Sequence, residues 1–214
     1  MKPGPRRSLS QADIVAAAFG ILEAQGFGAV SVRRVAAAVG LTPAAMYTYF
    51  PSKAALLRAM VEQLLSTTDL AAASDDDRPW RDRVHALAAA LRSRLAEHAG
   101  AIVLVTSGPL DGAHALALNE VLIAGFVREG MPDAEGAHAA HAVRSYVLGA
   151  ALLDAGTAAA AGDGSHEPGV PLWSDAAGFP RSAATGDVSS GDAGFRFGLD
   201  RLLDGLERRV PVLE

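Results

Sequence analysis

The sequence predicts an all-α protein with a small N-terminal helical domain and a larger helical body. Apolar residues recur three or four positions apart along most of the 214-residue chain, which is the period of an amphipathic helix. Half of the residues are hydrophobic, and alanine supplies much of that half, which favours closely packed helices. We place the two domains at residues 8–68 and 69–214, because the composition turns polar and acidic over residues 66–79.

The first predicted helix begins at Ser10, whose hydroxyl suits an N-cap, with Asp13 in the first turn where a carboxylate complements the helix dipole. Gly26 is expected to end this helix. Its predicted buried face consists of Ile14, Val15, Ala18, Phe19 and Leu22. We expect the helix to pack behind the next two helices and to hold them rigid.

Residues 31–53, SVRRVAAAVGLTPAAMYTYFPSK, predict two short helices joined by a tight turn, with a further helix starting directly after them. Ser31 is a suitable N-cap, and Gly40 can adopt the positive φ that ends a helix. Thr42 caps the second short helix, and Pro43 occupies its first position, where no amide proton is needed. The segment therefore predicts a helix-turn-helix.

The second of these helices has one inward and one outward side. Met46 and Phe50 are one turn apart and are expected to face the core. The outward residues are then small, hydroxylated or aromatic, namely Pro43, Ala44, Ala45, Tyr47, Thr48 and Tyr49. A short exposed helix of this kind, next to basic residues, suits the major groove of DNA.

The run GLTPAAMYTYFPSKAALLRAM, preceded by SLSQADIVAAAFGILEAQGF, resembles the DNA-binding domain of TetR-family transcriptional regulators over residues 8–68. The ending FRFGLDRLLDGLERRV resembles the last helix of the Tet-repressor-like C-terminal class of that family. The resemblance implies an N-terminal three-helix helix-turn-helix DNA-binding domain and a C-terminal helical domain for ligand binding and dimerisation. It implies a homodimeric repressor that leaves its palindromic operator when a small-molecule effector binds.

Charge is distributed unevenly along the chain. The formal net charge is −5, yet residues 1–60 contain seven lysines and arginines against only Asp13 and Glu23, a net charge of +5. The other 154 residues therefore sum to −10. A basic first quarter on an acidic body is typical of a chain that meets phosphate at one end.

The expected DNA contacts come from the helix-turn-helix and its flanks. They are Ser31, Arg33, Arg34, Thr42, Pro43, Ala44, Ala45, Tyr47, Thr48, Tyr49 and Lys53. The resemblance aligns Arg33 with a residue that reaches a base edge, where a guanidinium can bond two acceptors of guanine. Arg34 is expected to meet phosphate or solvent, Tyr47 either phosphate or the first helix, and Lys53 phosphate at the start of the fourth helix.

The fourth helix carries a wide apolar stripe, and in the resembling family it acts as a lever between the two domains. Residues 66–79 predict a linker or helix end. The body then predicts helices at 80–97, 111–128, about 135–161 and 195–210, with a short apolar piece at 102–105. Residues 162–191 are rich in Gly, Pro, Ser and Asp and predict a long loop, either docked over the body or disordered.

Two features of the body point to partners. The last two long helices suit a four-helix interface with a second subunit, which a palindromic operator requires. Polar residues expected among the apolar helices are candidates to line an effector pocket, namely His98, His114, Asn119, Arg144, Tyr146 and Trp173. Spacing along the chain does not decide which of them do.

Other classes of protein have less support. His138 and His141 are three residues apart, with Glu135 a turn earlier, but no further ligand cluster follows, so we expect no metal and no cofactor. The chain shows none of the common nucleophile, phosphate-loop or dinucleotide motifs, so we expect no enzyme. Without cysteine, signal peptide or membrane span, the cytoplasm is the expected compartment. The alternative is a helical small-molecule or protein-binding module without sequence-specific DNA binding.

Overall fold

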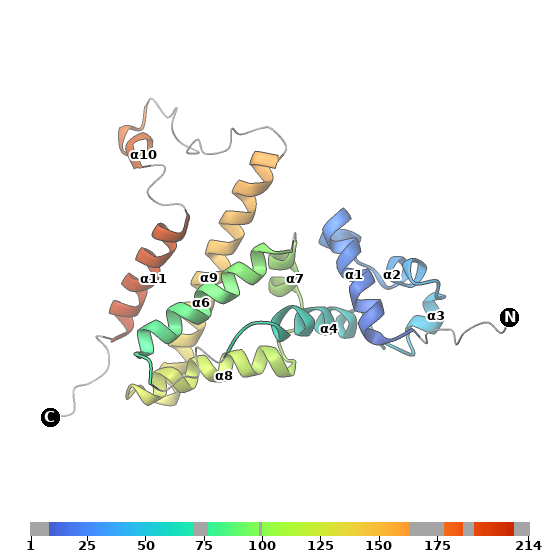
Figure 1. Ribbon diagram of the computed structural model, residues 1–214, viewed down its shortest axis with the longest axis horizontal. Helices are drawn as coiled ribbons and strands as arrows, with labels where there is room; N and C mark the ends of the chain where they lie inside the picture. Colours follow the sequence, from blue (N-terminus) through green and yellow to red (C-terminus); the bar gives the residue numbers. More distant parts are fainter. Residues whose placement is uncertain (1–8, 71–76, 99, 163–177, 186–190, 208–214) are drawn as a thin grey trace. The chain divides into compact units, whose positions relative to one another are not determined.

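The computed structural model describes residues 9–70, 77–98, 100–162, 178–185 and 191–207, and within these ranges every regular element is a helix (Figure 1). The elements are α1 (Gln11–Gln25), the 3-10 helix η1 (Phe27–Ala29), α2 (Val32–Ala38), α3 (Pro43–Met46), α4 (Lys53–Ser66), α6 (Trp80–Ala96), α7 (Ala101–Ser107), α8 (Ala113–Arg128), α9 (Asp133–Gly162), α10 (Pro180–Thr185) and α11 (Gly191–Glu207). The predicted all-α fold is confirmed. No helix in the described ranges combines the length and the apolar content that a membrane crossing requires.

The chain divides into two compact units. The first contains residues 1–68 and 97–117, and the second contains residues 69–96 and 118–214. The predicted domain 8–68 thus falls in the first unit, together with α7 and the first turn of α8. Residues 97–117 belong to this unit because of contacts with residues far away in the sequence. Sequence periodicity does not predict such contacts.

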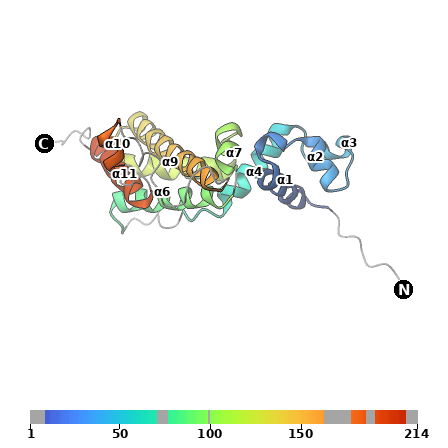
Figure 2. The same ribbon diagram turned by 90° about the horizontal axis from the view of Figure 1, so that it is seen from above.

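In the first unit, α1 packs against η1, α2 and α4, and α2 packs against α3 (Figure 2). The face of α1 predicted to be buried is buried at all five positions. The apolar stripe of α4 is also buried, at Leu56, Leu57, Met60, Val61, Leu64 and Leu65. The first helix therefore forms the platform on which η1, α2 and α4 pack.

The helix ends follow the predicted capping residues. Ser10 forms a capping box with Asp13, since its hydroxyl oxygen accepts from the Asp13 amide and the Asp13 carboxylate accepts from the Ser10 amide. Gly26 ends α1 with a φ of 77°. In this conformation glycine avoids the steric cost that a side chain would bring.

In the second unit, α6 packs along α9, and α11 packs against both (Figure 1). One face of α6 is buried, at Val84, Leu87, Ala88, Leu91 and Leu95. Tyr146 of α9 stacks on Phe195 of α11 and donates its hydroxyl to the Phe195 carbonyl oxygen at 2.8 Å. A Cβ at Gly198 would overlap the Tyr146 hydroxyl, so this close approach of α9 and α11 requires glycine.

Ion pairs fasten α11 to α6. Arg92 of α6 binds Asp154 of α9 and Asp192 of α11, each at 2.7 Å, and its guanidinium lies 4.6 Å from the centre of the Phe195 ring. Nearer the other end of α6, His85 lies 2.8 Å from Asp200. The Asp192 contact belongs to the first turn of α11, which begins at Gly191 rather than at the predicted residue 195.

The predicted loop 162–191 contains one helix among its described residues, the six-residue α10. The apolar residues Pro171, Leu172, Trp173 and Phe179 are those that could anchor this loop to the body, but Phe179 is 69% exposed. Pro171, Leu172 and Trp173 lie outside the described residues.

Candidate nucleic-acid interface

Helices α2 and α3 form a helix-turn-helix whose turn depends on Gly40. The φ of Gly40 is 72°, and the amide of Leu41 then donates to the Ala36 carbonyl at 2.8 Å. This return bond satisfies a carbonyl at the end of α2 that has no partner inside the helix. The predicted helix-ending role of Gly40 is confirmed.

Side-chain caps fix the start of both helices. The Ser31 hydroxyl accepts from the Arg34 amide at 3.3 Å, and the Thr42 hydroxyl accepts from the Ala45 amide at 3.1 Å. Pro43 occupies the first turn of α3, as predicted. Only Pro43–Met46 form a full α-helix, and Tyr47–Tyr49 continue as turns. We refer to Thr42–Tyr49 as the recognition segment; only its four residues Pro43–Met46 are regular α-helix.

The recognition segment has a buried anchor and an exposed outer side. Met46 is fully buried and Phe50 is 4% exposed, which confirms the predicted inward pair. On the outer side Thr42, Pro43, Ala44, Tyr47 and Thr48 are exposed, whereas Ala45 and Tyr49 are half-buried. Tyr47 is 52% exposed, so its ring is largely available to a partner.

Several of these polar groups also have partners within the unit. The Thr48 hydroxyl donates to the Ala45 carbonyl at 2.7 Å. Gln11 of α1 donates from Nε2 to the carbonyl oxygen of Tyr49 at 2.8 Å, which ties the end of the recognition segment to α1. This role of Gln11 was not predicted, since no spacing rule connects residues 38 positions apart.

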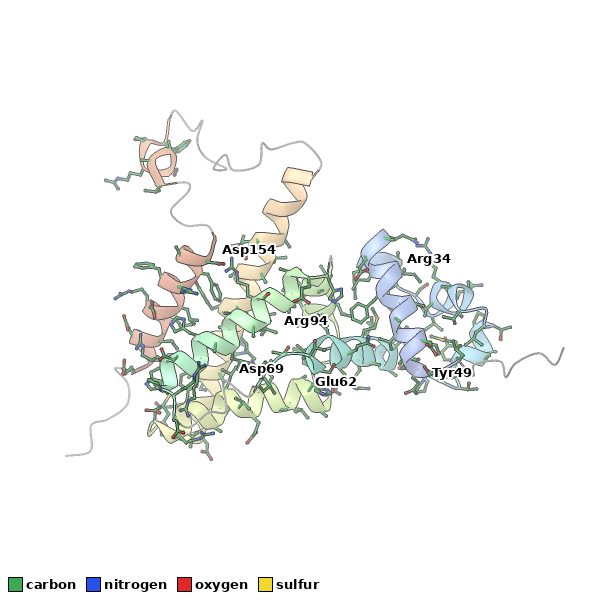
Figure 3. All side chains as sticks on the ribbon, viewed as in Figure 1. Arg34, Tyr49, Glu62, Asp69, Arg94 and Asp154 are labelled. Atoms are coloured by element: carbon green, nitrogen blue, oxygen red, sulfur yellow. The ribbon has the colours of Figure 1, made fainter. Side chains whose placement is uncertain are left out.

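The three predicted cationic contacts have different surroundings. Arg33 is exposed on α2. Arg34 donates from Nη1 to Oε1 of Gln25 at 2.8 Å, and Figure 3 shows it beside the end of α1. The Lys53 ammonium lies 5.6 Å from the centre of the Phe27 ring. Phe27 and Gln25 thus orient two cations at the edges of the helix-turn-helix, although neither was predicted to matter there.

The residues predicted to line an effector pocket lie in different places. His98 and His114 belong to the first unit, where they lie 2.7 Å from Glu23 and 3.0 Å from Glu62. In the second unit Arg144 donates to the Asn119 side chain, and Tyr146 is bonded to Phe195. Trp173, the sixth, lies outside the described residues.

Two cavities formed by described residues of the second unit differ in lining. A small cavity of about 10 Å³ is lined by Trp80, Arg83, Val84, Leu87, Val121, Leu122 and Gly125. An open groove of about 970 Å³ is lined by thirteen residues, mostly of α6 and α11, and seven of them are charged, including Arg78 before α6 and Asp154 of α9. None of the described pocket candidates His98, His114, Asn119, Arg144 and Tyr146 lines either cavity.

His138 and His141 are both exposed on α9. Among the described residues, no group of three or more His, Asp or Glu side chains is arranged to hold a metal ion.

Comparison with known proteins agrees with this geometry. The family model described as "Bacterial regulatory proteins, tetR family" matches residues 14–60, and "Tetracyclin repressor-like, C-terminal domain" matches residues 73–210. The HTH-type transcriptional repressor DrrR1 of Streptomyces coeruleorubidus is 29% identical over 215 residues, covering 95% of this chain and 79% of DrrR1.

Solved structures share the whole fold. A possible TetR family transcriptional regulator from Streptomyces coelicolor A3(2) is 31% identical with a TM-score of 0.77, covering 93% of this chain and 99% of that one. BioQ, solved with its natural double-stranded DNA operator, is 27% identical with a TM-score of 0.67, covering 94% of this chain and 100% of that one. The chain therefore belongs to the TetR family of bacterial regulatory proteins and is a DNA-binding transcriptional regulator.

Proposed function

We propose that this regulator is a homodimeric repressor that binds a palindromic operator and releases it when a small, largely apolar effector binds. The observation that supports DNA reading most directly is the presentation of the recognition segment. Met46 and the adjoining Phe50 are buried, whereas most of its small and hydroxyl-bearing residues are exposed and only Ala45 and Tyr49 are half-buried. Such a surface offers methyl groups and hydrogen-bond donors to base edges.

The proposed DNA contacts are the eleven residues predicted from the sequence. Thr42, Pro43, Ala44 and Ala45 approach base edges, and Arg33 reaches a guanine. Tyr47, Tyr49 and Lys53 bind phosphate, with the N-terminus of α4 adding its positive end at Lys53. The relatives DrrR1, a transcriptional repressor, and BioQ, solved with its operator, support the repressor assignment by similarity.

Two features of the second unit support the dimer and the effector. Large apolar side chains are exposed on α9 and α11, namely Leu152, Leu153 and Phe197 at 53%, 74% and 64% exposure. Burial against a second copy would remove this apolar surface from water. The small cavity between α6 and α8, whose lining is mostly apolar, suits a largely apolar effector better than the charged groove does. At about 10 Å³ it is too small to hold such a molecule, so the effector has to displace side chains to enter.

A DNA selection tests the proposal. The full-length protein is incubated with random duplexes, and bound sequences are amplified and read over several rounds. We expect a palindromic consensus whose affinity falls steeply with salt, because phosphate contacts release counterions. A flat salt dependence without a consensus would instead support the alternative, a helical binding module without sequence-specific DNA binding.

The effector is tested with the selected duplex. Compounds are screened for release of the labelled duplex, and those that release it are titrated against a Trp173→Phe variant. Trp80 is then the only tryptophan and lines the apolar cavity. We expect an effector to change Trp80 fluorescence over the same concentrations that release DNA. This proposal places the protein in the cytoplasm and includes no catalytic step.

A further inference from the structure

Glu62 of α4 binds the exposed end of another helix. Its carboxylate oxygens accept hydrogen bonds from the backbone amides of His114 at 2.8 Å and Ala115 at 3.1 Å, and Oε2 lies 3.0 Å from His114 Nδ1. The amides at the start of an α-helix have no partner inside that helix. Glu62 therefore acts as an N-cap for α8 from a different helix, 52 residues away in the sequence.

A second contact lies one turn earlier on the same face of α4. The Arg58 guanidinium binds the Asp111 carboxylate in a two-bond arrangement, Nε to Oδ1 at 2.6 Å and Nη2 to Oδ2 at 2.7 Å. This geometry fixes direction as well as distance. The two contacts together clamp residues 111–115 onto α4, and we refer to Arg58, Glu62, Asp111 and the amides of 114–115 as the polar joint.

The backbone is shaped to receive this clamp. A Cβ at Gly112 would overlap the Glu62 carboxylate, so only glycine allows the carboxylate to reach the amides beyond it. At the other end of the loop, a Cβ at Gly108 would lie 2.7 Å from the Leu104 carbonyl oxygen and 3.0 Å from Val61 Cγ2. The loop from α7 to α8 thus lies directly against α4 at both ends, and Figure 3 shows Glu62 at this position.

Two packed helices of the first unit, α4 and α1, lie between the polar joint and the recognition segment. Helix α4 packs on α1, and Gln11 of α1 binds the Tyr49 carbonyl. In the other direction, α8 is one continuous helix whose residues 118–128 belong to the second unit. These residues include Val121, Leu122 and Gly125 of the apolar cavity. A shift of the first turn of α8 would therefore alter the joint, because His114 and Ala115 lie in that turn.

We propose that Glu62 and Arg58 are the positioning residues that couple α8 to the DNA-binding helices, so that operator binding and the position of the first turn of α8 depend on each other. The inference rests on the proposed function. Coupling between two sites is reciprocal, so operator binding must alter the α8 end if the α8 end alters operator binding. This reciprocity allows a test without knowledge of the effector.

Hydrogen exchange measured by mass spectrometry on the full-length protein tests the coupling. The probe is the tightest duplex recovered by selection from random DNA. In the wild type, the duplex is expected to change the exchange rate of peptides covering residues 112–117 by at least about fivefold. In Glu62→Gln, which keeps the shape but loses the charge, the change is expected to fall below about twofold.

Two further variants separate coupling from simple loss of structure. Asp111→Asn removes the second clamp at an exposed position and is expected to weaken the response in the same direction. Glu120→Gln neutralises an exposed carboxylate elsewhere on α8 and is expected to retain the full wild-type response. The readout is the difference in exchange rate between the DNA-bound and the DNA-free protein. General destabilisation would raise the exchange rate in both states alike and would leave this difference unchanged.

The outcomes distinguish this inference from the proposed function. If the wild type binds the selected duplex but exchange at 112–117 does not respond, the coupling role is wrong and the repressor assignment stands. The same holds if Glu62→Gln and Asp111→Asn respond as strongly as the wild type. If no duplex is selected at all, the proposed function and the inference both fail.

Discussion

At the scale of single residues, the exposed cations around α3 divide into candidates for base reading and candidates for phosphate binding. Arg33 is exposed on α2, whereas Arg34 is held by Gln25 and Lys53 lies beside Phe27. A side chain held at the edge of the motif suits a phosphate, whose position does not vary with sequence. A side chain that can extend into the groove suits a base edge.

Arg33→Ala and Lys53→Ala are therefore expected to weaken DNA binding in different ways. Arg33→Ala should cost about 1–3 kcal/mol on the selected duplex and relax the preference at one base pair. Lys53→Ala should weaken binding to specific and random duplexes equally. It should also reduce the slope of log affinity against log salt concentration by about one, the share of one phosphate contact. Gel-shift titrations at several salt concentrations measure both. Equal losses on specific and random DNA for Arg33→Ala would remove its base-reading role.

Glu62 should make stability depend on pH. Its partial burial alone would raise its pKa, but the hydrogen bonds from the His114 and Ala115 amides and from the His114 side chain lower the pKa below its ordinary value of 4.5. Because the folded pKa lies below the unfolded one, the stabilisation is complete above pH 4.5 and is lost as pH falls through the folded pKa.

Glu62→Gln is thus expected to reduce the free energy of unfolding by about 1.5–3 kcal/mol at pH 7, the usual range for hydrogen bonds to a charged group. The difference from the wild type should shrink as pH is lowered through the range below 4.5. Urea denaturation followed by circular dichroism measures it, with Glu120→Gln as the control. A difference that is independent of pH would show that the carboxylate charge is not the cause.

At the scale of elements, the turn between α2 and α3 is the most constrained part of the candidate interface. Gly40 has a φ of 72°, and a Cβ added there would meet nothing within 4 Å, so the need for glycine is conformational rather than steric. Gly20 lies inside α1 with equal space around it. The two glycines therefore form a matched pair in the same unit.

Gly40→Ala is expected to destabilise the protein by about 1–2 kcal/mol, because an L-residue is strained in the left-handed region. Gly20→Ala is expected to stabilise it by about 0.5–1 kcal/mol, because alanine loses less backbone entropy in a helix. Thermal unfolding of both variants measures these opposite signs. Stabilisation by Gly40→Ala would show that the turn differs from the one described.

At the scale of the whole molecule, operator binding by a dimer should depend on the exposed apolar residues of α9 and α11. Leu153, at 74% exposure, is the most exposed of them. Leu153→Glu is expected to yield monomers in sedimentation velocity and to reduce operator affinity by about 100-fold or more, since two linked half-site contacts reinforce each other.

Phe179→Glu is the control for this change, because Phe179 is similarly exposed at 69% but lies outside α9 and α11. It is expected to leave both the oligomeric state and the operator affinity unchanged. A wild-type protein that sediments as a monomer at every concentration would contradict the proposed dimer.

For α1, α2 and α3, the sequence itself determined the residues that cap the helices and those that face the core. Ser10, Ser31 and Thr42 cap as predicted, Gly26 and Gly40 end their helices, and Met46 and Phe50 are buried. These features are local, since each depends on residues within about one turn of the helix. The family resemblance rests on the same local run and is confirmed by the comparisons.

What only the tertiary structure decided are the contacts between residues far apart in the chain. It placed 97–117 with the DNA-binding helices, and it paired His98 and His114 with Glu23 and Glu62. It also revealed the polar joint, in which a carboxylate of one helix caps another 52 residues later. Helical periodicity specifies which face of a helix is apolar, but the partner of each polar side chain depends on how the packed helices approach one another.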